Sequence, residues 1–298
     1  MIPEGAETIR ASSLPTWADC PRRWAATQRR RLLTGAGYDL RQRSPNIGAH
    51  VGTGSHAGVA RTWEGIAAAG DPAPLDECDD VAVEALRKRA GEEGTSWDRT
   101  TPDMNAAEGA TRKILRAYRS DIPRHRRPEL IEASLAARIG GLWYLTGHTD
   151  LFTEPDRACE DFKTGVRPPT PIAQIGAYSL MLVAGGKPVN RARMVWTRRV
   201  GPKTEQPPPM TVGYDVRVAM ITARRSVDDI RRTVDAFSLG GDASPFAPSG
   251  GAAPRTPPGS RRARTTSRCR AMSTSSCSRR SRKSRASGGT TPPSSERR

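Results

Sequence analysis

Three short motifs with chemically active side chains follow one another in the middle of this 298-residue chain. In chain order they are Gly147-x-x-Asp150, Asp161-x-Lys163 and Gln174-x-x-x-Tyr178. Carboxylates bind hard cations such as Mg²⁺ or Mn²⁺ through oxygen and leave coordination positions for water. A bound cation activates water and screens the charge of a phosphate. Together the motifs predict a site that attacks a phosphodiester with water.

The two acids, Asp150 and Asp161, are expected on adjacent strands, from the β-compatible residues that surround them. The expected elements are a strand over residues 143–152, a turn over 154–157 and a second strand over 157–163. Alternation along the second strand places Asp161 and Lys163 on one face and Phe162 in the core. Pairing of the strands brings Asp150 beside Asp161. Two carboxylates at close range repel each other unless a cation lies between them.

Lys163 has two interpretations on these residues alone. It can orient the attacking water or stabilise charge that develops on the phosphorus, a contribution whose loss typically slows a reaction roughly 10²–10³-fold. Alternatively, Asp161 and Lys163 form a solvated cross-strand charge pair, which is the common meaning of an isolated acid–x–Lys triplet.

Gln174 and Tyr178 lie in a segment, residues 171–183, that is expected to be a helix. Pro171 suits the first turn and Gly185-Gly186 suits the end. Residues four apart share a helix face, so the amide and the hydroxyl can grip a nucleic-acid backbone or support metal ligands. The alternative is that Tyr178 belongs to the core and Gln174 to the surface.

With these motifs in this order, the sequence resembles the RecB-like branch of the PD-(D/E)xK nuclease superfamily. It is most similar to the CRISPR-associated RecB-like exonucleases, which have relatives in bacteriophages. The family's Gly-x-x-Asp, (Asp/Glu)-x-Lys and Gln-x-x-x-Tyr fall on Asp150, on Asp161 and Lys163, and on Gln174 and Tyr178. The resemblance implies an α/β fold, with a mixed central sheet flanked by helices and a metal site at one end.

Two segments nearer the N-terminus extend the resemblance, which covers residues 10–245. Residues 13–24 are similar to the family's opening helix, in which an aromatic residue precedes Cys-Pro. Gly52-Thr53-Gly54-Ser55-His56 precedes an apolar helix, as in the motif that carries a metal-binding histidine. An isolated histidine on a helix is more often structural, but here the resemblance implies that His56 is a metal ligand together with Asp150 and Asp161.

Glu132 lies in the strand-like segment 130–135 and resembles a further acid found before the metal motifs. The other expected elements are helices over 75–91 and 104–120, a basic loop over 124–127, a core strand at 194–196, a proline-rich loop over 202–209, and a strand and long helix over 212–237. The basic loop can touch a phosphate backbone, although such loops are more often solvated.

The net charge of +17 suits a polyanionic partner such as DNA, but it is unevenly distributed. Residues 249–298 contain 13 Arg or Lys and one Glu, so about +12 of the charge lies there. The expected nuclease domain, residues 1–248, therefore carries only a small excess. No apolar window is long enough to span a membrane and no signal peptide is evident. These features predict a cytoplasmic protein, in the host cytoplasm if a phage encodes it.

The tail, residues 249–298, is rich in Arg, Ser, Thr, Pro and Gly and has almost no aliphatic residues. Such a composition cannot build a core and predicts disorder. One interpretation is a non-specific, salt-sensitive DNA tether. Another is out-of-frame translation of a GC-rich gene, since shifting the Gly250-Gly251-Ala252 codons by one base permits Trp and Cys.

Five cysteines without a secretion signal argue against a disulfide framework. In the resembled family, four cysteines can bind a [4Fe–4S] cluster, one from the Cys-Pro motif and three from a cluster near the C-terminus. Cys20 matches the first of these. The expected trio is missing, because only Cys269 and Cys277 follow and they lack the tight spacing. Cys159 is expected to face the core.

The leading interpretation is a Mg²⁺- or Mn²⁺-dependent DNA nuclease, an exonuclease acting in DNA processing or recombination. Single- or double-stranded DNA ends are the expected substrate, and recombination or CRISPR adaptation proteins are the expected partners. The main alternative is a catalytically inactive DNA-binding protein that retains the fold. A weaker alternative is a scaffolding protein in a recombination or adaptation complex.

Overall fold

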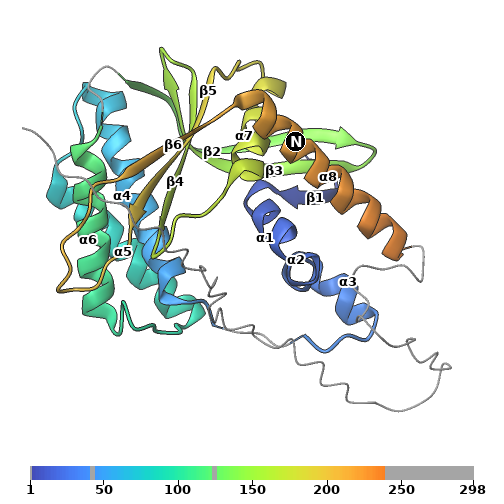
Figure 1. Ribbon diagram of the computed structural model, residues 1–298, viewed down its shortest axis with the longest axis horizontal. Coiled ribbons are helices and arrows are strands. Elements are labelled where there is room, and N and C mark those ends of the chain that lie inside the picture. The colour runs from blue at the N-terminus through green and yellow to red at the C-terminus, as the bar shows by residue number, and fades with distance from the viewer. Residues whose placement is uncertain (1, 41–43, 123–125, 239–298) are drawn as a thin grey trace, which may run out of the picture. The chain divides into compact units, whose positions relative to one another are not determined.

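The structure is a computed structural model that describes residues 2–40, 44–122 and 126–238 (Figure 1). Its elements are β1 (Glu7–Arg10), the 3₁₀ turn η1 (Ala11–Ser13), α1 (Leu14–Asp19), α2 (Pro21–Gln28), α3 (Arg30–Gly35), α4 (Ile47–Ala69), α5 (Leu75–Glu93), α6 (Met104–Ser120), β2 (Arg127–Gly140), β3 (Trp143–Glu154), β4 (Ala158–Gly165), α7 (Ile172–Ala184), β5 (Arg191–Arg198), β6 (Met210–Tyr214) and α8 (Val216–Ser238). The expected tail, residues 249–298, lies outside the described residues.

Six strands form one mixed sheet in the order β1-β3-β4-β5-β6, with β2 also paired to β3. The pairs β1–β3 and β4–β5 are parallel, and β2–β3, β3–β4 and β5–β6 are antiparallel. Helices cover both faces, with α4, α5 and α6 on one side and α7, α8 and the N-terminal helices on the other (Figure 1). The expected mixed sheet flanked by helices is confirmed.

One edge of β3 is divided between two neighbours. Strand β2 pairs along the whole of the opposite edge, so β1 and β4 must share the remaining one. Strand β1 pairs with residues 143–146 and β4 with residues 151–153. Residues 147–150, which carry the first acid motif, therefore lie in a gap between two strands. This gap in the sheet positions the site described below.

Helix α4 begins at Ile47, before the 52–56 motif that was expected to precede it. The Asn46 side chain accepts a hydrogen bond from the Gly48 amide and caps the helix at Ile47, so the glycines of the 52–56 motif lie inside the helix. Gly54 and Gly58 face α5, where a Cβ would meet the carbonyls of Ala82 and Cys78. These two glycines let α4 and α5 pack closely and bring His56 toward the sheet.

Helix α7 packs between the sheet and α8. A Cβ at Gly176 would meet the Ala219 carbonyl of α8, and one at Gly147 would meet the Tyr178 ring. Small residues at these two positions therefore let α7 approach both neighbours. Tyr178, Ile175 and Phe152 belong to the same buried cluster, which fills the space between the sheet and α7.

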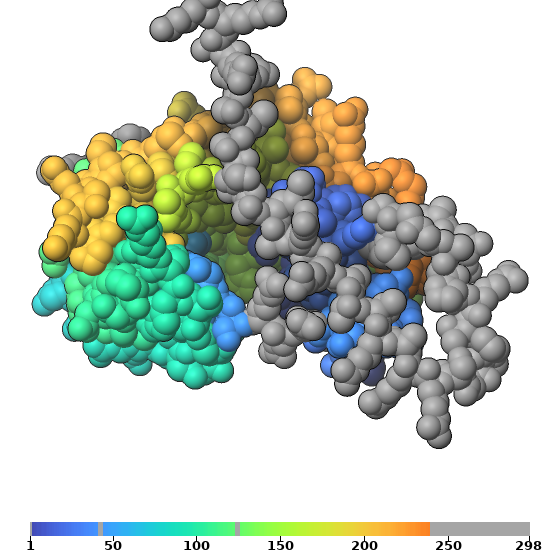
Figure 2. Space-filling model, turned by 60° about the horizontal axis from the view of Figure 1, so that its bottom comes forward, coloured from blue at the N-terminus to red at the C-terminus, as the bar shows by residue number. Residues whose placement is uncertain are grey.

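The second buried cluster lies between the sheet and α4, α5 and α6. Phe162 of β4 packs there, as its place in the strand predicted, with its ring 5.2 Å from that of His56 and 4.9 Å from that of Tyr118. The expected helices over 75–91 and 104–120, the strand at 194–196 and the loop over 202–209 are also present. Lys113 of α6 donates hydrogen bonds to the carbonyls of Pro202 and Thr204, so this loop, gold in Figure 2, adjoins α6, in green.

Arg126 does not belong to a solvated or phosphate-binding basic loop, contrary to the expectation for residues 124–127. Arg127 is the first residue of β2. The Arg126 side chain is largely buried and donates to Glu160 Oε2 at 2.8 Å, an oxygen that Arg193 also contacts at 2.8 Å. A buried carboxylate requires such partners, and this requirement fixes Arg126 behind the sheet. None of the described helices is long and apolar enough to cross a membrane.

Candidate active site

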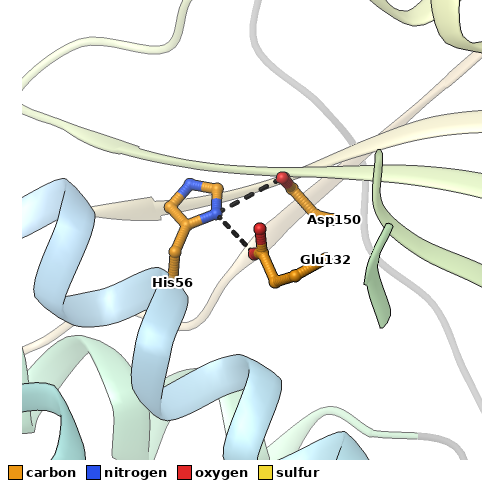
Figure 3. A group of neighbouring side chains, drawn as sticks. All are labelled: His56, Glu132 and Asp150. Atoms are coloured by element: carbon orange, nitrogen blue, oxygen red, sulfur yellow. Dashed lines mark hydrogen bonds and ion pairs between the residues drawn. The ribbon is translucent and has the colours of Figure 1, made fainter. Parts of the chain in front are cut away.

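His56 of α4 lies between two carboxylates of the β2–β3 hairpin (Figure 3). Its Nδ1 atom is 3.3 Å from Glu132 Oε1 and 3.4 Å from Asp150 Oδ1. Ligand atoms of the three residues all lie within 4.8 Å of one another, and they form the one such group among the residues that the structure describes. Imidazole and carboxylate groups are common ligands of divalent metals.

An unusual backbone conformation places Glu132. Its φ angle is +43°, in the left-handed region that costs a side-chain-bearing residue about 1–2 kcal/mol. The flanking pairs Ile131↔Leu151 and Ala133↔Thr149 put Glu132 across from Asp150 in the ladder. The distortion turns the Glu132 carboxylate toward His56. Local strain of this kind persists where surrounding structure enforces it and is concentrated at functional sites.

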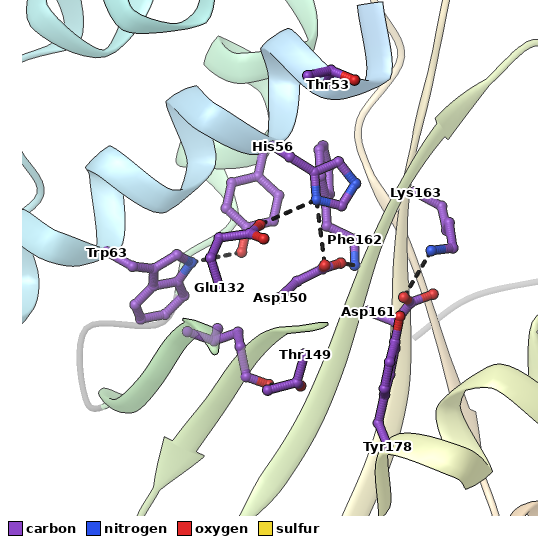
Figure 4. Close-up of polar contacts among 12 residues, drawn as sticks. Thr53, His56, Trp63, Glu132, Thr149, Asp150, Asp161, Phe162, Lys163 and Tyr178 are labelled. Atoms are coloured by element: carbon purple, nitrogen blue, oxygen red, sulfur yellow. Dashed lines mark hydrogen bonds and ion pairs between the residues drawn. The ribbon is translucent and has the colours of Figure 1, made fainter. Parts of the chain in front are cut away.

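The acid–x–Lys triplet and the Gln/Tyr pair form a second group, between β4 and α7. Figure 4 shows three of its members, Asp161, Lys163 and Tyr178. Lys163 Nζ donates to Asp161 Oδ1 at 2.7 Å, and Gln174 Nε2 donates to the same oxygen at 3.2 Å. Gln174 also donates to the Tyr178 hydroxyl at 2.8 Å. Both Gln174 and Tyr178 are buried, so the alternative that Gln174 lies on the surface is wrong.

A backbone contact joins the two groups. Asp150 Oδ2 accepts a hydrogen bond from the Phe162 amide at 2.6 Å, where a continued β3–β4 ladder would have used a backbone carbonyl. The two strands thus separate just beyond the Leu151↔Glu160 pair, and the acid side chains fill the space between them. Asp161 Oδ2 is buried there without a hydrogen-bond partner among the described residues.

Behind the site, a buried hydrogen-bond chain fixes β4 to the helices. Trp63 Nε1 donates to the Tyr118 hydroxyl at 2.8 Å, and that hydroxyl donates to Glu160 Oε1 at 3.1 Å. Glu160 precedes Asp161 and points to the opposite face of β4. Glu160 is fixed on the face of the sheet that packs against α4, α5 and α6. Its neighbour Asp161 therefore faces α7. Sequence reasoning did not identify Glu160, because no motif marks it and it directly precedes the acid of the acid–x–Lys triplet.

Carboxylates determine the charge state of His56. Burial alone would lower the His56 pKa, but Asp150 and Glu132 outweigh this effect and raise the pKa to about 10. Burial would raise the Asp150 pKa, whereas His56 and Lys163 lower it. The imidazole thus carries a proton in the metal-free protein. A metal ligand must be the neutral imidazole, so a cation would take the place of that proton.

Asp161 shows the opposite balance. Burial raises its pKa, Lys163 opposes the rise and Asp150 adds to it, with a result of about 6. Burial would lower the Lys163 pKa, but Asp161 and Asp150 raise it, so the lysine stays charged. Burial and the nearby acids also raise the Tyr178 pKa. The Tyr178 hydroxyl therefore keeps its proton and can act as a hydrogen-bond donor.

The residues present fit a divalent cation. The unpartnered Asp161 Oδ2 and the raised Asp161 pKa both indicate too little positive charge around this carboxylate. Glu132 adds a third acid to the two in the sequence motifs, and oxygen-rich donor sets of this kind suit Mg²⁺ or Mn²⁺. His56, Asp150 and Asp161 remain the predicted ligands. The spatial grouping adds Glu132 to them more directly than the sequence did.

A groove of about 690 Å³ opens onto this site. His56, Asp150, Lys163, Gln174 and Tyr178 line one part of it. The remainder of the lining comes from β1, η1 and the open part of the β2–β3 hairpin, and includes Arg10, Ser12, Ser134, Thr146 and His148. Sequence reasoning did not select these residues, because no motif marks them and β1 pairs with β3 across a separation of 136 positions.

The predicted iron–sulfur ligand stands apart from this site. Cys20 is half-buried between α1 and α2, and Cys78 and Cys159 are buried in different clusters. Burial raises the Cys159 pKa to about 12, which disfavours the thiolate that iron requires. Cys269 and Cys277 lie outside the described residues. The described cysteines do not form a cluster site, and the [4Fe–4S] assignment stays a prediction.

Comparison with known proteins adds the family. Among solved structures, one from Eubacterium rectale named "Putative exonuclease" is 12% identical, with 76% of this chain and 80% of that chain covered and a TM-score of 0.47. A structure named SSO0001 is also 12% identical, with coverage of 72% and 94% and a TM-score of 0.25. No curated protein sequence matches this chain. The family model described as the PD-(D/E)XK nuclease superfamily matches residues 8–253, and the chain belongs to that superfamily.

Proposed function

We propose that this protein is a Mg²⁺- or Mn²⁺-dependent nuclease that hydrolyses phosphodiester bonds in DNA. The observation that carries the proposal is the convergence of His56, Glu132 and Asp150 near the point where β3 and β4 separate, with Lys163 bonded to Asp161 on β4. Membership of the nuclease superfamily supports the reaction type. DNA as the substrate and the metal requirement are the proposed parts.

Each side chain then has a role that follows from its contacts. His56, Asp150, Asp161 and Glu132 would hold the cation, which when bound would supply an activated water and screen the phosphate charge. Lys163, which remains protonated beside two acids, stabilises negative charge on the phosphate as it is attacked. Gln174 holds the Asp161 carboxylate in place.

The Tyr178 hydroxyl accepts from Gln174 and lines the groove. Its own proton is therefore available to a phosphate oxygen of the substrate. Tyr178 binds the DNA backbone in this proposal, and its ring packs closely against Gly147. The same contacts explain why the residue is both buried and polar at one end.

The exonuclease assignment is the finer part of the proposal and rests on the motif resemblance. So do the RecB-like relationship and a setting among recombination or CRISPR adaptation proteins. Linear DNA labelled at one end, compared with closed circular DNA, tests the mode of attack. Release of short labelled products from linear DNA with the circle intact supports an exonuclease. Nicking of the circle assigns an endonuclease instead.

The primary experiment incubates the purified full chain with end-labelled linear DNA in EDTA, Mg²⁺ or Mn²⁺. The comparison variants are Asp161→Ala combined with Lys163→Ala, and, as a matched control on the same hairpin, Glu154→Gln combined with Arg157→Ala. Glu154 and Arg157 form an exposed ion pair away from the groove.

Metal-dependent degradation that is lost in the Asp161/Lys163 variant and retained in the control supports the nuclease and its site. Retention of DNA without degradation in any metal overturns the proposal and favours the inactive DNA-binding protein. Degradation that persists in the Asp161/Lys163 variant shows that the activity originates elsewhere.

A further inference from the structure

Arg10 lines the groove onto which the acid cluster opens. It is the last residue of β1 and pairs in register with Thr146 of β3. Its side chain is exposed and lines the same groove as His56 and Asp150. The proposed nuclease chemistry does not use it.

Arg10 also differs from other arginines that approach the sheet. Arg126, Arg193 and Arg199 are tied to carboxylates in or near the sheet. Arg10 has neither an ion pair nor a side-chain hydrogen bond to any residue in the described ranges. An arginine whose five donors are unused, in a groove rather than on an open convex surface, is suited to an anion supplied from outside.

Two further polar side chains, those of Ser12 and His148, line the same groove. Ser12 follows Arg10 in η1, is exposed, and lines the groove. His148, two residues beyond Thr146 on β3, is exposed and bonds Ser134 Oγ through Nε2 at 2.8 Å. A guanidinium, a hydroxyl and an imidazole that line one groove are groups suited to the oxygens of a phosphate.

Arg10 and the acids border the same gap in the sheet, over residues 147–150 of β3. Arg10 stands where β1 leaves the edge of β3, and Asp161 and Lys163 stand where β4 joins it. From Thr146 to Asp150 is four residues of β3, or about 13 Å at the rise of a strand. Successive phosphates of one duplex strand advance by about 3.4 Å along the axis, so both positions can contact one strand a few nucleotides apart.

We propose that Arg10, assisted by Ser12 and His148, is a second phosphate-binding subsite for the DNA strand whose scissile phosphodiester lies at His56, Asp150 and Asp161. The inference rests on the proposed nuclease function and extends it by assigning the path of that strand across the gap between β1 and β4. The guanidinium binds a phosphate flanking the scissile one and holds the strand in register with the acids.

Binding measured without cleavage tests the subsite. In an Asp161→Asn background, fluorescence anisotropy with a labelled oligonucleotide compares Arg10→Ala, Arg10→Lys and the control Arg224→Ala. Arg224 is an exposed arginine of α8 that does not line the groove. Circular dichroism and the melting temperature check that each variant folds, as expected for an exposed side chain without internal partners.

Loss of one charged phosphate contact predicts about tenfold weaker binding for Arg10→Ala. The plot of log K against log salt concentration should become shallower by about 0.7 to 0.9, the contribution of one phosphate. Arg10→Lys should keep the salt slope and lose part of the affinity, because it retains the charge without the planar fork. Equal affinities and slopes for Arg10→Ala and Arg224→Ala would overturn the inference.

Three oligonucleotides identify the source of the phosphate. They are a linear strand with a 5′-phosphate, the same strand with a 5′-hydroxyl, and a circular single strand. Weakening by Arg10→Ala on all three assigns an internal backbone phosphate, and weakening confined to the 5′-phosphorylated strand assigns a terminal one. Either pattern supports a phosphate subsite.

Cleavage by the wild-type chain, compared with the effect of Arg10→Ala on DNA binding, distinguishes failure of this inference from failure of the proposed function. Cleavage in Mg²⁺ or Mn²⁺ without any effect of Arg10→Ala on binding leaves the nuclease intact and removes the subsite. Arg10-dependent DNA binding without cleavage in any metal keeps the phosphate site and removes the nuclease. Absence of both DNA binding and cleavage removes both.

Discussion

Glu132 and Asp150 lie opposite each other in the β2–β3 ladder, and their carboxylates converge on the same nitrogen of His56. Residues directly opposite in a ladder share a face of the sheet, and the left-handed φ of Glu132 adjusts its direction. Two acids in this arrangement repel each other unless positive charge lies between them. The protonated imidazole provides that charge in the metal-free protein, and a cation would provide it in the active form.

Removal of the Glu132 carboxylate should weaken metal binding. We expect Glu132→Ala to lower the affinity for Mn²⁺ about tenfold or more, a loss typical of perturbed metal sites. Isothermal titration calorimetry of the full chain measures this, with Glu154→Gln on the same hairpin as the control. An unchanged Mn²⁺ affinity in Glu132→Ala would show that this acid is not a ligand.

Replacement of Glu132 by glycine should stabilise the metal-free fold relative to alanine. Alanine at a φ angle of +43° is destabilised by about 1–2 kcal/mol, whereas glycine adopts this angle without steric strain. Glycine also lowers the free energy of unfolding by about 0.5–1 kcal/mol, because its unfolded chain has greater conformational freedom. Urea unfolding in EDTA should therefore rank Glu132→Gly above Glu132→Ala by about 0.5–1 kcal/mol. The reverse order would mean that the backbone relaxes in the alanine variant.

Gln174 should act through Asp161 and not through the substrate. Gln174→Met keeps the shape and removes the donor that holds Asp161 Oδ1. We expect kcat to fall roughly 10–100-fold, as for groups that orient metal ligands, with KM little changed. Tyr178→Phe removes the hydroxyl that accepts from Gln174 and lines the groove, and leaves the bond between Gln174 and Asp161 in place. It should therefore raise KM more than it lowers kcat. Steady-state kinetics on a defined oligonucleotide distinguishes the two patterns.

Two helical glycines should respond to alanine with opposite signs. A Cβ at Gly176 of α7 would overlap the Ala219 carbonyl of α8, so Gly176→Ala should cost about 1–3 kcal/mol or more. A Cβ at Gly109 of α6 would meet nothing within 4 Å, so Gly109→Ala should stabilise by about 0.5–1 kcal/mol. Urea denaturation of the two variants gives both values. Similar effects at both positions would contradict the α7–α8 packing.

The ion pair of Asp98 and Arg199 should make stability depend on pH in the acid range. Arg199 is buried and donates to both Asp98 oxygens, at 3.1 and 2.6 Å, and these hydrogen bonds lower the Asp98 pKa. A lowered pKa in the folded state contributes stability that is present above the ordinary aspartate pKa, about 3.9. That stability is lost as pH falls through the lower, folded-state pKa.

Asp98→Asn should therefore be less stable than the wild type at pH 5 to 7, and the difference should shrink as the pH falls below about 4. Urea unfolding across this range in both proteins gives the comparison. Asp76→Asn, at an exposed acid in the first turn of α5, is the control. Its difference in stability from the wild type should not shrink comparably as the pH falls. A difference that is constant with pH would show that Asp98 is not linked to folding through its charge.

Local periodicity in the sequence determined much of the second group of site residues. Strand alternation placed Asp161 and Lys163 together with Phe162 on the other face, and helical spacing placed Gln174 beside Tyr178. These relationships depend only on the geometry of one element, so they can be predicted without knowledge of the remainder of the chain. The motif order likewise predicted the superfamily, which the family match confirms.

Tertiary structure alone decided which elements meet. The convergence of Glu132 on His56 depends on a positive φ angle that no residue type signals, and Arg126 was drawn behind the sheet by the buried Glu160. Strand β1 reaches β3 from the far end of the chain and shares its edge with β4, which opens the gap that Arg10 and the acids border. Such long-range pairings are selected by the burial of whole faces and by the satisfaction of buried charges, and both are properties of the complete fold.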